Sequence, residues 1–243
     1  MLYPSEKRLH FLNLFKTKRN ILSIKHIMKL EHIQIETNNI LKITAFYQDV
    51  LELSIIEKDE NSVSIQAGNS VLKFVENSSF KSIYHFAFNI PENKLDEAIK
   101  WCKNKVDFIL IEDQNVITNF ENWSAQAVYF YDTNGNLLEF IARHDLNNSQ
   151  TEAFNSKSIL NISEIGIVNE NPLELGNQLI AKHGLNFFSK NTNSEAFAAI
   201  GDDEGLLIMV KPNRNWYPTQ TPSEKNKTEV RLENNGIKID LYF

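Results

Sequence analysis

The chain has 243 residues and a mass of 28.1 kDa, and its hydrophobic fraction of 42%, with 16 phenylalanines, suffices for one large core or two smaller ones. Its 25 basic and 31 acidic residues give a net charge of -6, and residues 28–243 are more acidic still, because residues 1–27 hold six bases and one acid. So acidic a body would repel a phosphate backbone, which excludes nucleic acid as an expected partner.

The cysteine content and the N-terminal segment bear on where the protein is located. A single cysteine, Cys102, excludes an internal disulfide and suits a reducing compartment, so we expect a cytoplasmic protein. No apolar run approaches the roughly 20 residues that span a membrane, and residues 1–27 lack the apolar core of a secretory signal. This segment is either a basic, partly helical extension or the product of a mis-assigned start. We favour translation from Met28, because the first predicted strand follows it directly.

Three segments of the chain begin alike, which indicates an internal repeat. Each alternates apolar and polar residues with a period of two, as in a strand with one buried face. These segments are residues 30–36, 84–89 and 163–167. A helical spacing of apolar residues follows each one, and the third predicted helix is the best delimited, with Pro172 in its first turn and Gly184 at its end. Several short extended runs come next, so the repeating unit is βαβββ.

The repeats predict an α+β protein of tandem βαβββ modules with two domains. Two modules, over residues 28–144, are expected to pair about a pseudo-twofold axis into one half-open barrel. The polar segment 145–158, rich in Asn and Ser, is the predicted linker. Residues 159–243 then hold a third module and a hairpin around Asn234-Asn235-Gly236, which together form a second, incomplete domain.

Three side chains occupy matching places in the first two modules. His32 and His85 stand at the opening of the first strand of each module, on the face opposite the predicted core, and Glu139 lies on the last strand of module two. Two imidazoles and one carboxylate that converge in a cleft suit a divalent transition metal with open coordination positions. A substrate can then chelate the ion through two oxygens, and the ion acts as a Lewis acid.

Two stretches of the sequence resemble the vicinal oxygen chelate superfamily, which includes glyoxalase I, extradiol dioxygenases, fosfomycin-resistance transferases and bleomycin-resistance proteins. The first comprises residues 32–35 (HIQI) and 45–51 (AFYQDVL), and the second is residues 130–140 (FYDTNGNLLEF). The resemblance covers residues 29–143 and, more weakly, 159–211. It implies that His32, His85 and Glu139 are the metal ligands, as in the extradiol and fosfomycin-resistance patterns. The place of the fourth glyoxalase ligand holds Lys73, a poor ligand.

Further residues are candidates for contacts with the substrate. Lys73 either holds an anionic substrate near the metal or extends into water, and Gln34 and Arg143 lie on the same predicted strand faces as the ligands. Residues 113–125 form an insertion whose Trp123 either covers the substrate or is a buried anchor. Candidate proton donors are Tyr129 and Tyr131. The aromatic turn at residues 214–218 is expected to cap exposed core, and its alternative is entry into a substrate cleft.

Module three lacks the ligand set. Glu164 aligns with His32, and Ile208 or Met209 falls where Glu139 would be, so a second metal site of the same type is not expected.

The leading hypothesis is a metal-dependent enzyme that acts on a small substrate with two neighbouring oxygens. Dioxygenase, lyase and isomerase chemistry all fit, with one divalent ion: Fe²⁺ or Mn²⁺ is favoured, and Zn²⁺ or Ni²⁺ is compatible with non-redox chemistry. One alternative is a metal-free protein that binds or sequesters a drug, as in the bleomycin-resistance branch. The other is a thiol transferase of the fosfomycin-resistance type. An enzyme is favoured over a binding protein, and a homodimer is an assembly that the sequence leaves open.

Overall fold

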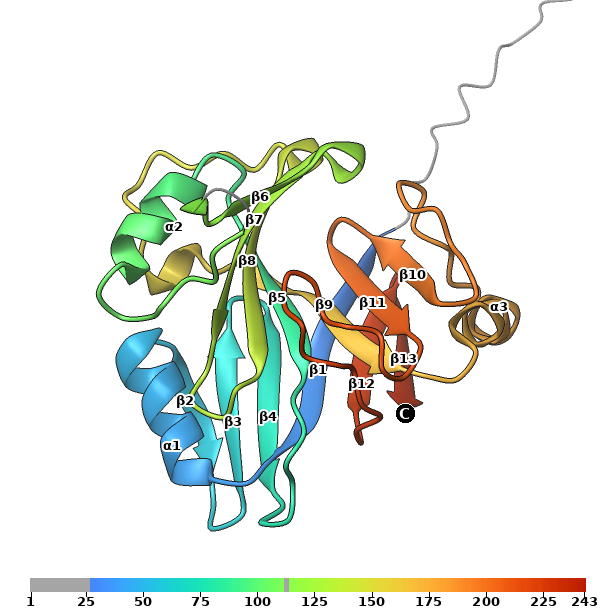
Figure 1. The fold of residues 1–243 in the computed structure, drawn as a ribbon, viewed down its shortest axis with the longest axis horizontal. Helices are drawn as coiled ribbons and strands as arrows, with labels where there is room; N and C mark the ends of the chain where they lie inside the picture. The colour runs from blue at the N-terminus through green and yellow to red at the C-terminus, as the bar shows by residue number, and fades with distance from the viewer. Residues whose placement is uncertain (1–26, 112–113) are drawn as a thin grey trace, which may run out of the picture.

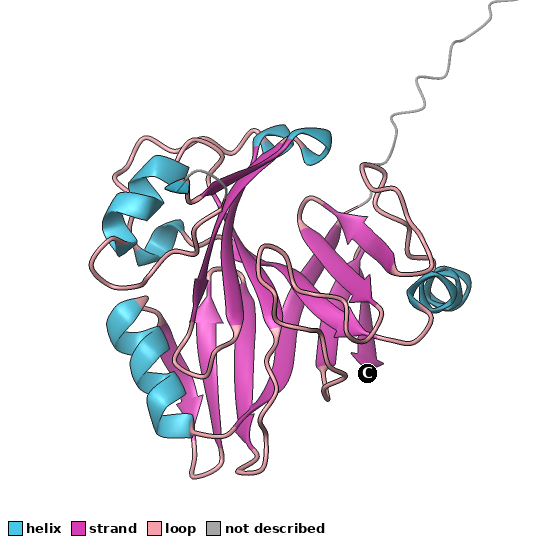
Figure 2. Ribbon diagram, viewed as in Figure 1, coloured by secondary structure: helices cyan, strands magenta, loops and turns pink. Residues whose placement is uncertain are grey.

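The computed structural model describes residues 27–111 and 114–243, which form two mixed β-sheets with α-helices on their outer faces (Figures 1 and 2). The first sheet has the strand order β13(Ile237–Tyr242), β12(Glu229–Asn234), β1(Met28–Thr37), β4(Ser70–Glu76), β3(Ser62–Ala67), β2(Ser54–Lys58). The second has the order β10(Phe197–Asp202), β11(Gly205–Val210), β9(Asn161–Val168), β5(His85–Ile90), β8(Leu137–Arg143), β7(Ala125–Tyr131), β6(Ile117–Phe120). The predicted α+β class is confirmed. Of the N-terminal extension expected at residues 1–27, residues 1–26 lie outside the described residues.

The helices begin and end where local chemistry dictates. The helix α1(Ile40–Ala45) is capped by Asn39, whose side chain accepts a hydrogen bond from the Lys42 amide, and it continues as a π-helical turn over Phe46–Val50. The helix α2(Leu95–Cys102) buries Leu95, Ala98 and Cys102 against the core. The helix α3(Pro172–His183) starts at a proline and ends at Gly184, which has the left-handed backbone that glycine favours, as predicted.

The stretches that carry the family resemblance join module one to module two. The hydroxyl of Tyr47, which follows α1, donates a 3.0 Å hydrogen bond to Asp132 in the turn between β7 and β8. In the same turn, the Thr133 hydroxyl donates to the Lys42 carbonyl, and the Asn134 amide donates to the Thr37 hydroxyl. These residues therefore fix the packing of two modules, which explains why the motif indicates the fold more strongly than the reaction.

The strand order corrects which modules share a sheet. We expected modules one and two to pair, but β5 of module two runs antiparallel to β9 of module three. The tail hairpin β12–β13 instead extends the sheet of module one, where β12 runs antiparallel to β1. Alternation of side chains fixes which face of a strand is buried but not which strand becomes its neighbour, so the sequence left this pairing undetermined. Segment 145–158 leads from module two to module three, and the division into two domains stays a prediction.

In each sheet, two sets of strands meet at one antiparallel pair, which is β1–β12 in the first sheet and β5–β9 in the second. We call these pairs the two junctions, and they have the same register. In β1 the pairing with β12 shifts between Leu30 and His32, and in β9 the pairing with β5 shifts between Ile162 and Glu164. Each first strand thus carries one bulged residue at the same place. Because His32 faces Arg231 and Glu164 faces Ala87, the two junctions are related by an approximate twofold symmetry.

One further difference concerns the insertion expected at residues 113–125. Its second half forms strand β6 and a 3₁₀ turn over Glu121–Trp123 rather than a loop. Ile117 and Thr118 are β-branched residues that favour a strand, and β6 pairs antiparallel with β7.

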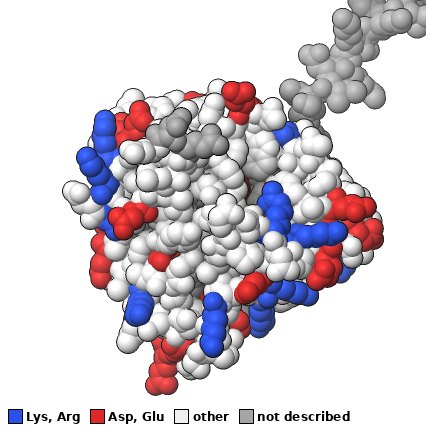
Figure 3. Space-filling view, in the orientation of Figure 1, with Lys and Arg blue, Asp and Glu red and all other residues white. Residues whose placement is uncertain are grey.

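A continuous core of buried apolar residues lies between the sheets and under the helices, and it includes Ile33, Phe74, Phe86, Phe140 and Ile165. A second buried cluster lies on the opposite face of the β9–β5–β8 region. On the outside, acidic and basic side chains are interspersed around one face of the molecule, with a wide uncharged area between them (Figure 3). Within the described ranges, no helix is long and apolar enough to cross a membrane.

Candidate metal centre and its cavity

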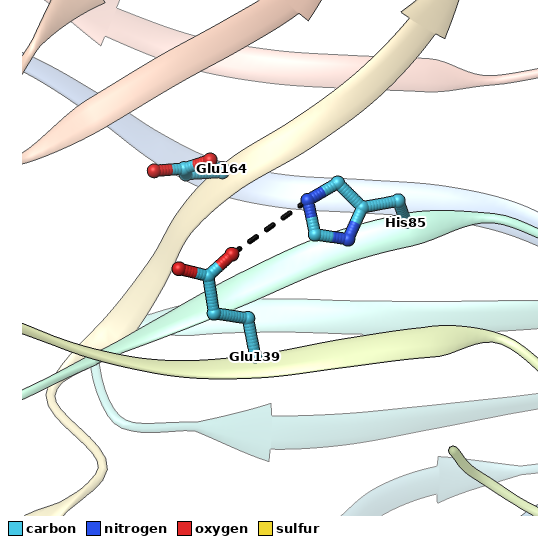
Figure 4. Close-up of side chains that lie close together, drawn as sticks. All are labelled: His85, Glu139 and Glu164. Atoms are coloured by element: carbon cyan, nitrogen blue, oxygen red, sulfur yellow. Dashed lines mark ion pairs between the residues drawn. The ribbon is translucent and has the colours of Figure 1, made fainter. Parts of the chain in front are cut away.

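Three neighbouring strands bring three metal-binding side chains together. His85 is the first residue of β5, Glu139 lies on β8 and Glu164 on β9, and β5 stands between the other two strands. Ala87, two residues after His85, faces Glu139 on one side and Glu164 on the other, so all three point to the same face of the sheet. One ligand atom from each lies within 4.8 Å of the others, and all three residues are buried (Figure 4).

His85 is prepared to act as a ligand through Nε2. Its Nδ1 lies 3.1 Å from the carbonyl oxygen of Leu137, which can only accept, so Nδ1 carries the proton and donates it. The Nε2 lone pair is then directed toward Glu139, whose Oε2 lies 3.7 Å away (Figure 4). Burial lowers the pKa of His85 to about 4, which keeps the ring neutral near pH 7.

The two glutamates share a buried cation. Arg143 is fully buried; its Nη2 donates to Glu164, and its Nε donates a 3.2 Å hydrogen bond to Asn89. Its Nη1 lies 3.5 Å from Oδ1 of Asp203, without hydrogen-bond geometry. Burial, and then the charge of Glu164, raise the pKa of Glu139 well above its usual range, while Arg143 lowers it. Without a cation, the raised pKa favours the protonated form of Glu139; a bound divalent cation would displace this proton and stabilise the carboxylate.

The donor set fits a divalent metal ion. One imidazole nitrogen and two carboxylates are ligands that Fe²⁺, Mn²⁺ and Zn²⁺ all accept, and the oxygen-rich set favours the harder ions Mn²⁺ and Fe²⁺. The hydrogen bonds from His85 to Leu137 and from Arg143 to Glu164 hold two of the three ligands in place, as outer-shell partners do in metal sites.

A cavity of about 220 Å³ lies over the cluster, and its walls are mostly aromatic. One wall comes from the β6–β7 hairpin and one from the loop between β11 and β12. The lining side chains other than the cluster are Phe120, Trp123, Tyr129, Phe197, Ile208, Arg214, Trp216 and Tyr217. Tyr217 joins the two walls, because its ring packs edge-on against those of Phe120 and Tyr129.

Trp216 packs against His85 of the cluster. Its ring centroid lies 5.3 Å from that of His85, and the residue is 3% exposed. Gly166 on β9 makes this position available, because a Cβ atom there would lie 2.5 Å from the Trp216 ring. The aromatic turn at residues 214–218 therefore enters the cleft, which was the alternative to capping the core.

The structure gathers some of the predicted site residues and separates others. His85, Glu139, Tyr129 and Trp123 all line the cavity. Tyr129 also donates a hydrogen bond to Glu139, and burial raises its pKa well above the usual range, so its hydroxyl stays protonated. By contrast, Tyr131 ends β7 and is exposed, outside the cavity lining. Trp123 packs edge-on against Phe188 and lies over the Arg143 guanidinium, so it is both an anchor and a wall.

The remaining predicted residues lie elsewhere. Gln34 and Lys73 face each other on β1 and β4 of the other sheet, as a half-buried pair, and neither lines the cavity. Arg143 lies beneath the cluster and supports Glu164 instead of facing a substrate.

His32 lies on the first sheet, in a separate pocket lined by Glu229, Arg231 and Asp240. Glu164 stands in the cluster where His32 was expected, because module three and not module one supplies the neighbour of β5. The alignment of Glu164 with His32 in the repeat was the signal for this residue.

Comparisons with known proteins agree with this architecture, although no family model matches the chain. Metallothiol transferase FosB from Staphylococcus haemolyticus is 29% identical over 120 residues, which cover 46% of this chain and 82% of that protein. Glyoxalase I from Zea mays superposes with a TM-score of 0.55 at 12% identity, covering 86% of this chain and 75% of that one. A candidate dioxygenase from Bacillus subtilis gives a TM-score of 0.55 at 16% identity, covering 89% and 70%. The chain has the vicinal oxygen chelate fold, as its motifs predicted.

Proposed function

We propose that the protein is a metal-dependent enzyme that binds one divalent ion through His85, Glu139 and Glu164 and acts on a small substrate with two neighbouring oxygens. The observation that carries this proposal is the convergence of three buried donors within 4.8 Å at the floor of an aromatic cavity. Mn²⁺ and Fe²⁺ are the favoured ions. The reaction is of the dioxygenase, lyase or isomerase type.

The chain's own residues have distinct tasks in this proposal. A bound ion would polarise the two substrate oxygens as a Lewis acid. Trp123, Trp216 and Tyr217 pack against a flat substrate and exclude water from the cluster. Tyr129 holds a proton next to Glu139, where its hydroxyl can donate to a substrate oxygen. Arg143 is a positioning residue, because it acts on the site through Glu164.

The test is elemental analysis of protein purified without a metal-chelating tag. The wild type is expected to contain about one equivalent of Mn or Fe, by the ligand chemistry given above. The variants His85→Ala, Glu139→Gln and Glu164→Gln should lose it. The matched control is His32→Ala, which removes the other strand histidine and should keep the metal.

The reverse pattern, in which Glu164→Gln keeps the metal and His32→Ala loses it, would overturn the ligand assignment. A wild type that holds no metal and refuses added metal would favour a ligand-binding protein with an aromatic cavity. Iron or manganese would direct further assays to oxygen uptake with catechols, whereas zinc or nickel would direct them to isomerase and lyase substrates.

A second candidate function is thiol transfer, and the observation that favours it is the likeness to a metallothiol transferase over 82% of that protein's length. Consumption of a small thiol in the presence of fosfomycin, dependent on Mn²⁺ and lost in Glu139→Gln, would support this activity over the first. No thiol loss under these conditions would exclude it.

A further inference from the structure

Arg214 differs from the other arginines in the described part of the chain. Arg143 pairs with Glu164, and Arg231 pairs with Asp240. Within residues 27–111 and 114–243, the Arg214 guanidinium forms neither an ion pair nor a hydrogen bond, and it lies 4.8 Å above the ring of Phe197. Both residues line the cavity over the metal-binding cluster. An exposed cation without a counter-ion therefore lies among the mostly aromatic walls of the cavity.

The loop that carries Arg214 is held by its own hydrogen bonds. The Ser223 amide donates to the Arg214 carbonyl at 2.9 Å, and the Ser223 hydroxyl donates to the Lys211 carbonyl at 2.8 Å. Two positions further on, Trp216 is anchored by the hydrogen bond from its amide to the Thr221 carbonyl. The Arg214 side chain thus extends from a backbone that these hydrogen bonds hold in place. Its stacking on Phe197 limits where the guanidinium can lie.

The charges along the cavity differ from end to end. The floor holds Glu139 and Glu164, which offer no positive charge to an anionic group unless a metal lies between them. The walls are aromatic, and Arg214 is the cation among the lining residues. A guanidinium binds a carboxylate through two parallel hydrogen bonds. A ligand with a negative group at one end and metal-binding oxygens at the other therefore matches both ends.

We propose that Arg214 selects substrates that carry a carboxylate on a planar ring, with the two neighbouring oxygens at the opposite end directed toward His85, Glu139 and Glu164. This inference rests on the proposed function for the position of the oxygens, whereas the contact between Arg214 and the carboxylate does not depend on a metal. The loop between β11 and β12 then determines which substrate is accepted, and modules two and three supply the metal ligands.

The experiment compares acids with their methyl esters, which have nearly the same size and the same two oxygens. The probes are 3,4-dihydroxybenzoate and 3,4-dihydroxyphenylacetate, which differ in reach by one methylene, each beside its methyl ester. Binding is measured by titration calorimetry without oxygen, on manganese-loaded protein and on chelator-treated protein. The variants are Arg214→Gln, Arg214→Lys and the control Lys182→Gln, which removes one exposed charge on α3.

For at least one acid, binding to the wild type is expected to be about tenfold tighter than for its ester, as a charge-assisted hydrogen bond predicts. Arg214→Gln should abolish this preference, Arg214→Lys should keep part of it, and Lys182→Gln should keep all of it. Equal binding of acids and esters by the wild type, survival of the preference in Arg214→Gln, or no binding of any probe would overturn the proposal.

The chelator arm separates the two proposals. If the metal assignment holds, chelation weakens the acid and the ester alike, while their ratio is kept. If the ratio is kept and chelation changes nothing, the role of Arg214 stands and the metal assignment falls. If chelation weakens binding but acid and ester never differ, the metal assignment stands and the role of Arg214 falls.

Discussion

The two junctions related by the approximate twofold carry opposite chemistry. At the β5–β9 junction, His85 and Glu164 are buried beneath an aromatic cavity. At the β1–β12 junction, the corresponding residues are Glu229 and His32, which lie half-buried in a polar pocket beside an exposed pair formed by Arg231 and Asp240. The backbone register is the same, so backbone geometry alone does not make the site.

The difference arises from what surrounds each junction. On one side, β8 continues the sheet next to β5 and supplies Glu139, and the loop between β11 and β12 covers the cluster. On the other, the sheet continues from β12 to β13 and ends there, and β13 supplies Asp240, which neutralises Arg231. A third ligand and a cover are therefore what turn one of two similar strand junctions into a candidate metal centre.

The largest expected effect comes from removing the buried cation. Arg143→Met leaves Glu164 buried without its partner, which should lower the free energy of unfolding by about 3–5 kcal/mol. The matched change at the other junction, Arg231→Met, should alter stability little, because solvent screens its exposed ion pair with Asp240. Urea denaturation of both variants measures this, and similar losses in the two would contradict the contrast between the junctions.

A second test concerns the hydrogen bond between Tyr47 and Asp132, which joins module one to module two. Burial raises the pKa of Asp132 to about 6, above the 3.8 of an exposed aspartate. The folded protein therefore binds this proton more tightly than the unfolded chain. The associated stability is fully present below about pH 4 and is lost as the pH rises toward about 6, by roughly 3 kcal/mol.

The measurement is denaturation at several pH values from 4 to 7, for the wild type and for Asp132→Asn. The variant should lack this part of the decline, so the difference between the two proteins should change across the window. Parallel pH curves for the two proteins would show that Asp132 titrates normally.

The smallest of the three effects is expected at Gly166. Gly166→Ala places a methyl group against Trp216, so the ring must move away from His85 at a cost of about 1–3 kcal/mol. At the other junction the corresponding residue is Gln34, and Gln34→Ala should leave stability nearly unchanged. Thermal unfolding gives the stabilities, and tryptophan fluorescence reports the displaced ring. Unchanged fluorescence in Gly166→Ala would mean that Trp216 is not held as described.

Much of this architecture was accessible from the sequence, for reasons that individual residues show. Period-two alternation placed His85 and Glu139 on the face opposite the core, and both lie there in the cluster. Pro172 and Gly184 delimit α3 as local chemistry requires. Glu164 was not identified, although it aligns with His32, because its role depends on β9 pairing with β5, a long-range choice that side-chain alternation does not encode. The entry of Trp216 into the cavity depends likewise on the absence of a side chain at Gly166.

The pairing of β1 with β12 has a consequence for the order in which the protein can be built. Ile27, just before β1, donates a hydrogen bond to Asn235, 208 positions further along the chain. A ribosome delivers β1 first, so this strand waits with an open edge until β12 emerges, whereas β5, β8 and β9 can already associate. The metal-binding junction is thus expected to mature before the first sheet is complete, and the unpaired edge of β1 is the part of a nascent chain most in need of protection from aggregation.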